Sequence, residues 1–127
     1  MTEARFLLDT NICIYLLEGT SDAARDSIEA CTPGEVVTSA IAYAEVVRGI
    51  RMDNADDAAK AAAFFDAVEV VPFDSDAALH YRAISFRRGT FDRLIAAHAL
   101  SLGLTLVTNN ERDFADVTGL KVENWTI

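Results

Sequence analysis

The feature that most constrains the fold is a regular alternation of short apolar runs with longer segments of helical pattern. The apolar runs, each about four to six residues long, predict strands at 5–8, 35–39, 68–73, 104–108 and 120–125. The longer segments predict helices at 11–19, 21–31, 40–52, 54–68, 75–89 and 91–103. Strands separated by helices are typical of βαβ units. We therefore predict an α/β fold with a parallel sheet of four to five strands flanked by α-helices.

Length and composition support one domain over residues 1–127. Hydrophobic residues make up 51% of the chain, which excludes a disordered tail. No apolar run approaches the ~20 residues of a membrane span, and the N-terminal run is too short for a signal peptide. Cys13 and Cys31 lack metal-binding spacing, so we interpret them as buried or incidental thiols. These features predict a soluble cytoplasmic protein.

The net charge of −9 argues against nucleic-acid binding unless the basic residues are clustered. Four arginines do lie close together in the chain, at Arg82, Arg87, Arg88 and Arg93, while acidic residues gather elsewhere, as in residues 52–60. A solvated charged face explains the acidic segment. The arginine cluster is open to either interpretation, a solvated face or a contact surface for phosphates.

Asp9 ends the first apolar run abruptly, in the stretch "RFLLDTN". One interpretation is a helix N-cap, because aspartate side chains accept the unpaired N–H groups there. The other is a ligand position, since ligands of open α/β sheets lie just outside the carboxyl ends of the strands. The stretch alone leaves both interpretations open.

Glu45 is surrounded by small and apolar residues in "SAIAYAEVVRGI". Helical spacing allows an ion pair with Arg48, which contributes little to stability. The neighbours Ala42, Val46 and Val47 instead suggest a largely buried helix, in which a carboxylate needs a partner. Glu45 is therefore a candidate functional acid.

Two further places bring oxygen-rich side chains to the same predicted edge. Asp92 lies in the first turn of an apolar helix, where capping or the helix dipole would also explain it. Thr108, Asn109 and Asn110 follow a predicted strand as Asp9 does. Clustered carboxylates repel one another unless a divalent cation neutralises them, and all-oxygen sites suit Mg²⁺ or Mn²⁺. Such sites hydrolyse phosphodiesters.

Four segments together resemble the motif regions of the PIN-domain ribonucleases, and most nearly the VapC toxins of prokaryotic toxin–antitoxin pairs. They are "LLDTNICIYLL", "TSAIAYAEVVRGI", "FDRLIAAHALSLGLTLVTNNERDF" and "GLKVENW", in order along essentially the whole chain. The resemblance implies a PIN fold and an endoribonuclease that cuts single-stranded or looped RNA, often a tRNA or a ribosomal RNA loop. It also implies a VapB-type antitoxin whose tail covers the active site, and a homodimer within a larger complex.

The resemblance places three acids, Asp9, Glu45 and Asp92, at the positions that hold Mg²⁺ or Mn²⁺. A fourth position, an aspartate in many PIN domains, is Asn110 here, with Asp113 three residues on as the substitute acid. We expect catalysis and metal binding from Asp9, Glu45, Asp92 and Asp113, with Asn110 and Thr108 organising the site. Arg82, Arg87 and Arg88 are expected to line the approach of the RNA.

Other function classes fit less well. A receiver-type signalling domain needs an acidic pair after its first strand, and a haloacid-dehalogenase phosphatase needs an acid at position 11, which is Asn11. A more serious alternative is a catalytically weak PIN-fold protein that acts by binding a partner or RNA. His80 and His98 are interpreted as ordinary helix residues, because metal-bound water already supplies a nucleophile.

Overall fold

The computed structural model describes residues 3–88 and 90–127 and contains one sheet of five parallel strands. The strands are β1 (Phe6–Leu8), β2 (Val36–Ser39), β3 (Glu69–Val71), β4 (Thr105–Val107) and β5 (Val122–Glu123). Their order across the sheet is β3-β2-β1-β4-β5. The predicted α/β class, parallel sheet and strand number are confirmed.

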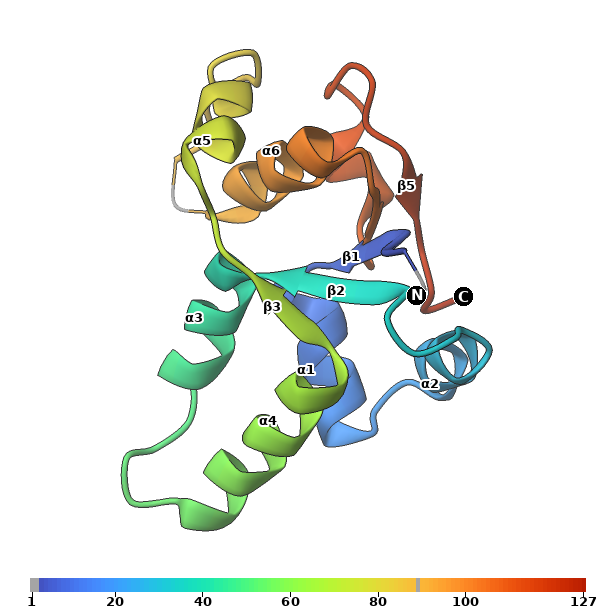
Figure 1. The fold of residues 1–127 in the computed structure, drawn as a ribbon, viewed down its shortest axis with the longest axis vertical. Helices are drawn as coiled ribbons and strands as arrows, with labels where there is room; N and C mark the ends of the chain where they lie inside the picture. Colours follow the sequence, from blue (N-terminus) through green and yellow to red (C-terminus); the bar gives the residue numbers. More distant parts are fainter. Residues whose placement is uncertain (1–2, 89) are drawn as a thin grey trace.

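The helices of the described segments follow the strands much as the sequence pattern predicts (Figure 1). They are α1 (Thr10–Glu18), α2 (Asp22–Glu29), α3 (Ala40–Arg48), α4 (Ala55–Ala67), α5 (Ser75–Tyr81) and α6 (Asp92–Leu102), followed by a 3₁₀ turn η1 (Glu111–Phe114). Two of them stop at a glycine in the left-handed conformation, Gly19 with φ 69° and Gly103 with φ 68°. Glycine adopts this conformation without a Cβ penalty, which fixes the helix ends.

Two predicted helices are too long. The predicted helix at 75–89 ends at Tyr81, because the next N–H groups, those of Arg82, Ala83 and Ile84, bond to carbonyls three residues back rather than four. Its predicted last residue, 89, lies outside the described residues. The predicted helix at 40–52 likewise ends at Arg48, followed by three-residue turns.

Helices cover both faces of the sheet, as expected for parallel strands. Alternate residues of β1 point to opposite faces: Leu7 packs with α6 and η1, whereas Phe6 and Leu8 pack with α1, α2 and α4. Helix α3 contacts both cores, through Ala42 on one side and Val46 on the other. Because α3 begins directly after β2, its first turn lies at the carboxyl edge of the sheet.

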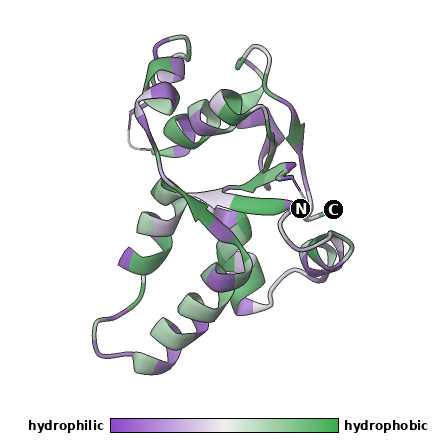
Figure 2. Cartoon of the chain, in the orientation of Figure 1, coloured by the Kyte–Doolittle hydropathy of each residue, from purple (hydrophilic) through white to green (hydrophobic). Residues whose placement is uncertain are grey.

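Hydrophobic and hydrophilic residues occupy different faces of the helices. Figure 2 shows hydrophobic and hydrophilic residues side by side along α4, the pattern of a helix with one face on the core. Over residues 3–88 and 90–127, no helix is both long and apolar enough to cross a bilayer.

Candidate active site

The carboxyl ends of two neighbouring central strands bring polar side chains to one edge of the sheet. Asp9 follows β1, the middle strand, and Thr108 follows the neighbouring β4. Both residues are buried, with 4% and 1% of their surfaces exposed. This edge is where ligands of open parallel sheets bind.

Asp9 caps α1 and is at the same time a buried acid. Its Oδ1 accepts a hydrogen bond from the Ile12 N–H at 3.0 Å, and the Thr108 side chain also bonds to its carboxyl group. The capping interpretation of Asp9 is thus confirmed. The ligand interpretation does not conflict with it, because a carboxylate has more lone pairs than a single cap uses.

Keeping the Asp9 carboxylate ionised at this buried position is unfavourable. Burial raises the pKa of Asp9 to about 6, against the lowering effect of its bonds to Thr108 and Ile12. Repulsion from Asp92 and Glu45 raises the Asp9 pKa further. Asp92 of α6 and Glu45 of α3 therefore act electrostatically on Asp9, which directly follows β1.

Glu45 lies on the inward side of α3 and accepts a hydrogen bond from the Thr10 hydroxyl at 2.6 Å. Within the described residues, no ion pair joins Glu45 to Arg48. The expectation of a largely buried helix is wrong for one side, since Val47 is 37% exposed. Glu45 itself is half-buried and points to the acid edge.

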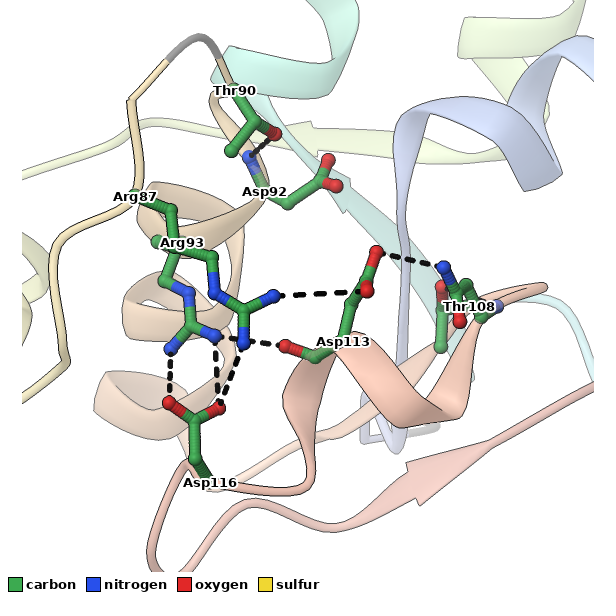
Figure 3. A network of polar contacts seen from close by, with 8 residues as sticks. Arg87, Thr90, Asp92, Arg93, Thr108, Asp113 and Asp116 are labelled. Carbon is green, nitrogen blue, oxygen red and sulfur yellow. Dashed lines mark hydrogen bonds and ion pairs between the residues drawn. The ribbon is translucent and has the colours of Figure 1, made fainter.

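Asp92 begins α6 without capping it. The N-cap is Phe91, which makes no side-chain cap bond, and the Asp92 N–H donates to the Thr90 hydroxyl at 3.1 Å (Figure 3). The carboxylate of Asp92 is therefore not used by the helix end. Its first-turn position still places it favourably in the field of the α6 dipole.

Asp113 lies on η1, and its carboxylate already contacts two other side chains. Its Oδ2 accepts from the Asn110 side-chain amide at 2.7 Å, and its Oδ1 lies 3.7 Å from the Arg87 guanidinium (Figure 3). Asn110 is itself placed by Thr108, whose hydroxyl accepts the Asn110 N–H at 3.2 Å. A metal-binding role for Asp113 or Asn110 stays a prediction.

The arginine cluster divides into two kinds of residue. Arg82, Arg87 and Arg88 are exposed. Arg93 is only 2% exposed and bonds to Asp116. Counting Arg93 with a surface cluster is therefore wrong, because helical periodicity turns it into the protein.

No side-chain hydrogen bond joins the histidines or cysteines to Asp9, Glu45 or Asp92 in the described residues, although the charge of Asp9 helps to raise the pKa of Cys13. His98 is buried, and its ring nitrogen lies 2.8 Å from the Ser39 hydroxyl. His80 is exposed and contacts the Asp76 carbonyl. Cys13 and Cys31 are free thiols.

The comparison with known families decides which fold family this architecture represents. The PIN domain family matches residues 6–120 of the chain. The chain belongs to the PIN-domain family. The resemblance that the sequence motifs indicated is confirmed, and the five-stranded sheet is that of a PIN domain.

Relatives of this PIN domain are VapC proteins. It is 34% identical to the tRNA(fMet)-specific endonuclease VapC of Salmonella typhimurium, over 95% of this chain and 98% of the relative. It is 28% identical to ribonuclease VapC2 of Rickettsia felis, over 94% of this chain and 97% of the relative.

Solved structures agree with these relatives. The PIN domain superimposes on a chain of DNA-bound VapBC from Salmonella typhimurium with a TM-score of 0.85, at 30% identity over 96% of this chain and 98% of that one. VapBC2 from Rickettsia felis, bound to a promoter DNA fragment, gives a TM-score of 0.81 at 27% identity over 94% and 98%.

The acids of this PIN domain suit a divalent cation in their chemical kind. Carboxylate oxygens are hard ligands, and a cation would offset the repulsion that raises the Asp9 pKa. The carboxylates are not drawn together into a finished site: in the described parts of the chain, no three His, Cys, Asp or Glu side chains group closely enough to hold an ion.

Sequence reasoning missed the residues that hold these acids. Thr90, two positions before Asp92, carries a signal that could have been used, because threonine is frequent at helix starts. Thr10 and the Arg93–Asp116 pair carry none, since their partners are far away in the chain. Only the folded chain brings them together.

Proposed function

We propose that this PIN domain is the toxin of a VapBC-type toxin–antitoxin pair and an endoribonuclease that hydrolyses RNA phosphodiester bonds with Mg²⁺ or Mn²⁺. The observation that carries the proposal is the buried Asp9 carboxylate at the end of the central strand, with Glu45 and Asp92 close enough to raise its pKa. A buried carboxylate that two neighbouring acids repel does not stabilise the chain, which supports a cation site here.

The proposed ligands are Asp9, Glu45 and Asp92, with Asp113 or Asn110 completing the set. When bound, a divalent cation activates water and stabilises the negative charge that develops on the phosphate. Ile12 and Thr108 contact the Asp9 carboxylate, and Thr10 orients Glu45.

The substrate is proposed to be a tRNA or a ribosomal RNA loop, in line with the tRNA(fMet)-specific relative. Arg82, Arg87 and Arg88 supply the positive charge that an acidic protein needs to approach a phosphate backbone. They precede Asp92 in the chain, so contacts there would bring RNA to the acids.

The proposed partner is a VapB-type antitoxin, because the structural neighbours are VapBC complexes. A homodimer inside such a complex and a cytoplasmic location belong to the same proposal. They follow from the kind of system to which the relatives belong.

The test is RNA cleavage by the purified chain at increasing Mg²⁺ or Mn²⁺, with EDTA as the zero point. Asp9→Asn is the matched variant, since asparagine keeps the cap on Ile12 and removes the charge. Cleavage by the parent and loss of cleavage in Asp9→Asn support the proposal. RNA binding without cleavage by the parent at any metal concentration would support instead a PIN-fold protein that acts by binding.

A further inference from the structure

Arg93 is a charged side chain that the fold places inside the protein next to the proposed metal ligands. It is the second residue of α6, directly after Asp92, and only 2% of its surface is exposed. The acids of the proposed site lie on several elements, so something must hold those elements at a fixed separation. Arg93 is placed to do so.

The guanidinium of Arg93 joins α6 to the segment that contains η1. Its two terminal nitrogens donate to the two carboxylate oxygens of Asp116, at 3.1 and 2.8 Å, and one of them also donates to the Asp113 carbonyl at 2.9 Å (Figure 3). The bond to a carbonyl holds the main chain of η1 itself. A planar guanidinium can make this three-bond contact, whereas a lysine ammonium cannot reproduce it.

Stability alone does not account for a buried arginine at this position. Removing a guanidinium from water is costly, and an apolar side chain of similar volume is often as stabilising or more so. The Asp116 side chain is 42% exposed, so water weakens its attraction to Arg93. What the contact supplies is a fixed geometry.

We propose that Arg93 is a positioning residue, which fixes η1 and its residues Asn110 and Asp113 against the end of α6 that carries Asp92. The inference rests on the proposed function. Arg93 touches neither RNA nor ion in this role. It keeps the third acid and the fourth candidate ligand at one separation, so that both elements contribute to the same site.

The experiment measures Mn²⁺ binding to the full chain without RNA, by the loss of the free Mn²⁺ electron paramagnetic resonance signal. Arg93→Lys keeps the positive charge but removes the planar guanidinium and its paired donors. Asp116→Asn removes the negative charge of the partner and so weakens the same contact. Each substitution should raise the Kd for Mn²⁺ about tenfold, as removal of a residue that orients metal ligands does. The two effects should be less than additive in the double variant, since both substitutions remove the Arg93–Asp116 contact, although Asp116→Asn also loses an ion pair with Arg87.

Arg5→Lys is the matched control. Arg5 pairs with Glu35 at 2.9 Å, but its side chain is 65% exposed and far from the acids in the fold, at the start of β1. This substitution should leave Mn²⁺ binding unchanged. Thermal unfolding of every variant, followed by circular dichroism, separates loss of fold from loss of position.

The outcomes distinguish the inference from the proposed function. If the parent binds Mn²⁺ and cleaves RNA while Arg93→Lys and Asp116→Asn bind Mn²⁺ with the parent Kd, Arg93 is only structural and the inference is wrong. A lower unfolding temperature with unchanged Kd has the same meaning. If Arg93→Lys does not fold, Asp116→Asn decides. A parent that neither binds Mn²⁺ nor cleaves RNA overturns the proposed function and the inference with it.

Discussion

The Thr10 hydroxyl donates to Glu45 Oε1 over 2.6 Å, so the first turn of α1 holds an acid that α3 carries. Thr10 directly follows Asp9, which caps the same turn. One strand end thus supplies an acid of the proposed site and the donor that orients the next acid.

Removing the Thr10 hydroxyl should impair catalysis more than folding. Thr10→Val keeps the shape of the side chain but leaves Glu45 without its donor. We expect RNA cleavage to slow about tenfold, the effect of losing ~1.4 kcal/mol of transition-state stabilisation. Thr10→Ser restores the hydroxyl and should restore the rate. A Thr10→Val protein as active as the parent would show that Glu45 needs no orienting bond.

Removing the Asp9 charge should stabilise the protein in EDTA. The pKa of Asp9 is raised from 3.8 to about 6 in the folded chain, so the folded state binds this proton more tightly than the unfolded state. The free energy of unfolding therefore falls as the pH rises through this window. Asp9→Asn lacks this loss, which amounts to up to about 3 kcal/mol.

Urea unfolding of parent and Asp9→Asn across this pH window measures the effect. The stability difference in favour of the variant should grow from pH 3.8 to about 6 and stay constant above. If the difference in the free energy of unfolding between variant and parent does not change with pH, the pKa of Asp9 is not raised by burial and the prediction is wrong.

Asp113→Asn tests the fourth ligand. Asparagine retains a side-chain oxygen for the Asn110 amide, but it cannot offset a cation or attract Arg87. If Asp113 completes the site, we expect the rate to fall about tenfold or more and the Mn²⁺ concentration for half-maximal rate to rise. If activity and metal dependence are unchanged, Asn110 rather than Asp113 is the fourth ligand.

The exposed arginines should act on RNA affinity rather than on the chemical step. Arg82→Ala with Arg88→Ala spares Arg87, which contacts Asp113. The slope of RNA affinity against salt concentration should fall by the equivalent of about one phosphate contact per arginine. The rate at saturating RNA should be nearly unchanged. Filter binding at several salt concentrations measures the slope, and equal slopes for variant and parent would identify a merely solvated face.

His98 should make the fold sensitive to acid. Burial lowers the pKa of His98, although Asp74 and the Pro72 backbone oppose the shift. The folded state then binds the proton less tightly than the unfolded state, so stability falls as the pH drops below the ordinary value of 6.5. His98→Gln cannot charge, and its stability deficit relative to the parent should shrink toward about pH 5. The exposed His80→Gln serves as control, and a deficit independent of pH would contradict the prediction.

The alternation of apolar runs and helical patterns was sufficient to predict the parallel sheet, because local periodicity already fixes which face of each strand and helix is buried. The ends of α3 and α5 were not predictable in this way. Both end where the hydrogen bonding changes from four-residue to three-residue spacing, although the sequence pattern continues.

Asp9, Glu45 and Asp92 could be predicted as one group because each interrupts an apolar pattern, and parallel strands bring such interruptions to one edge. The sequence by itself therefore determined the fold class and singled out these acids as candidate ligands. Only the tertiary structure decided what holds them, namely Thr10 for Glu45, Thr108 for Asp9, and Arg93 with Asp116 for η1. These partners are separated by many residues, and a contact between distant residues depends on how the elements pack, which local sequence does not encode.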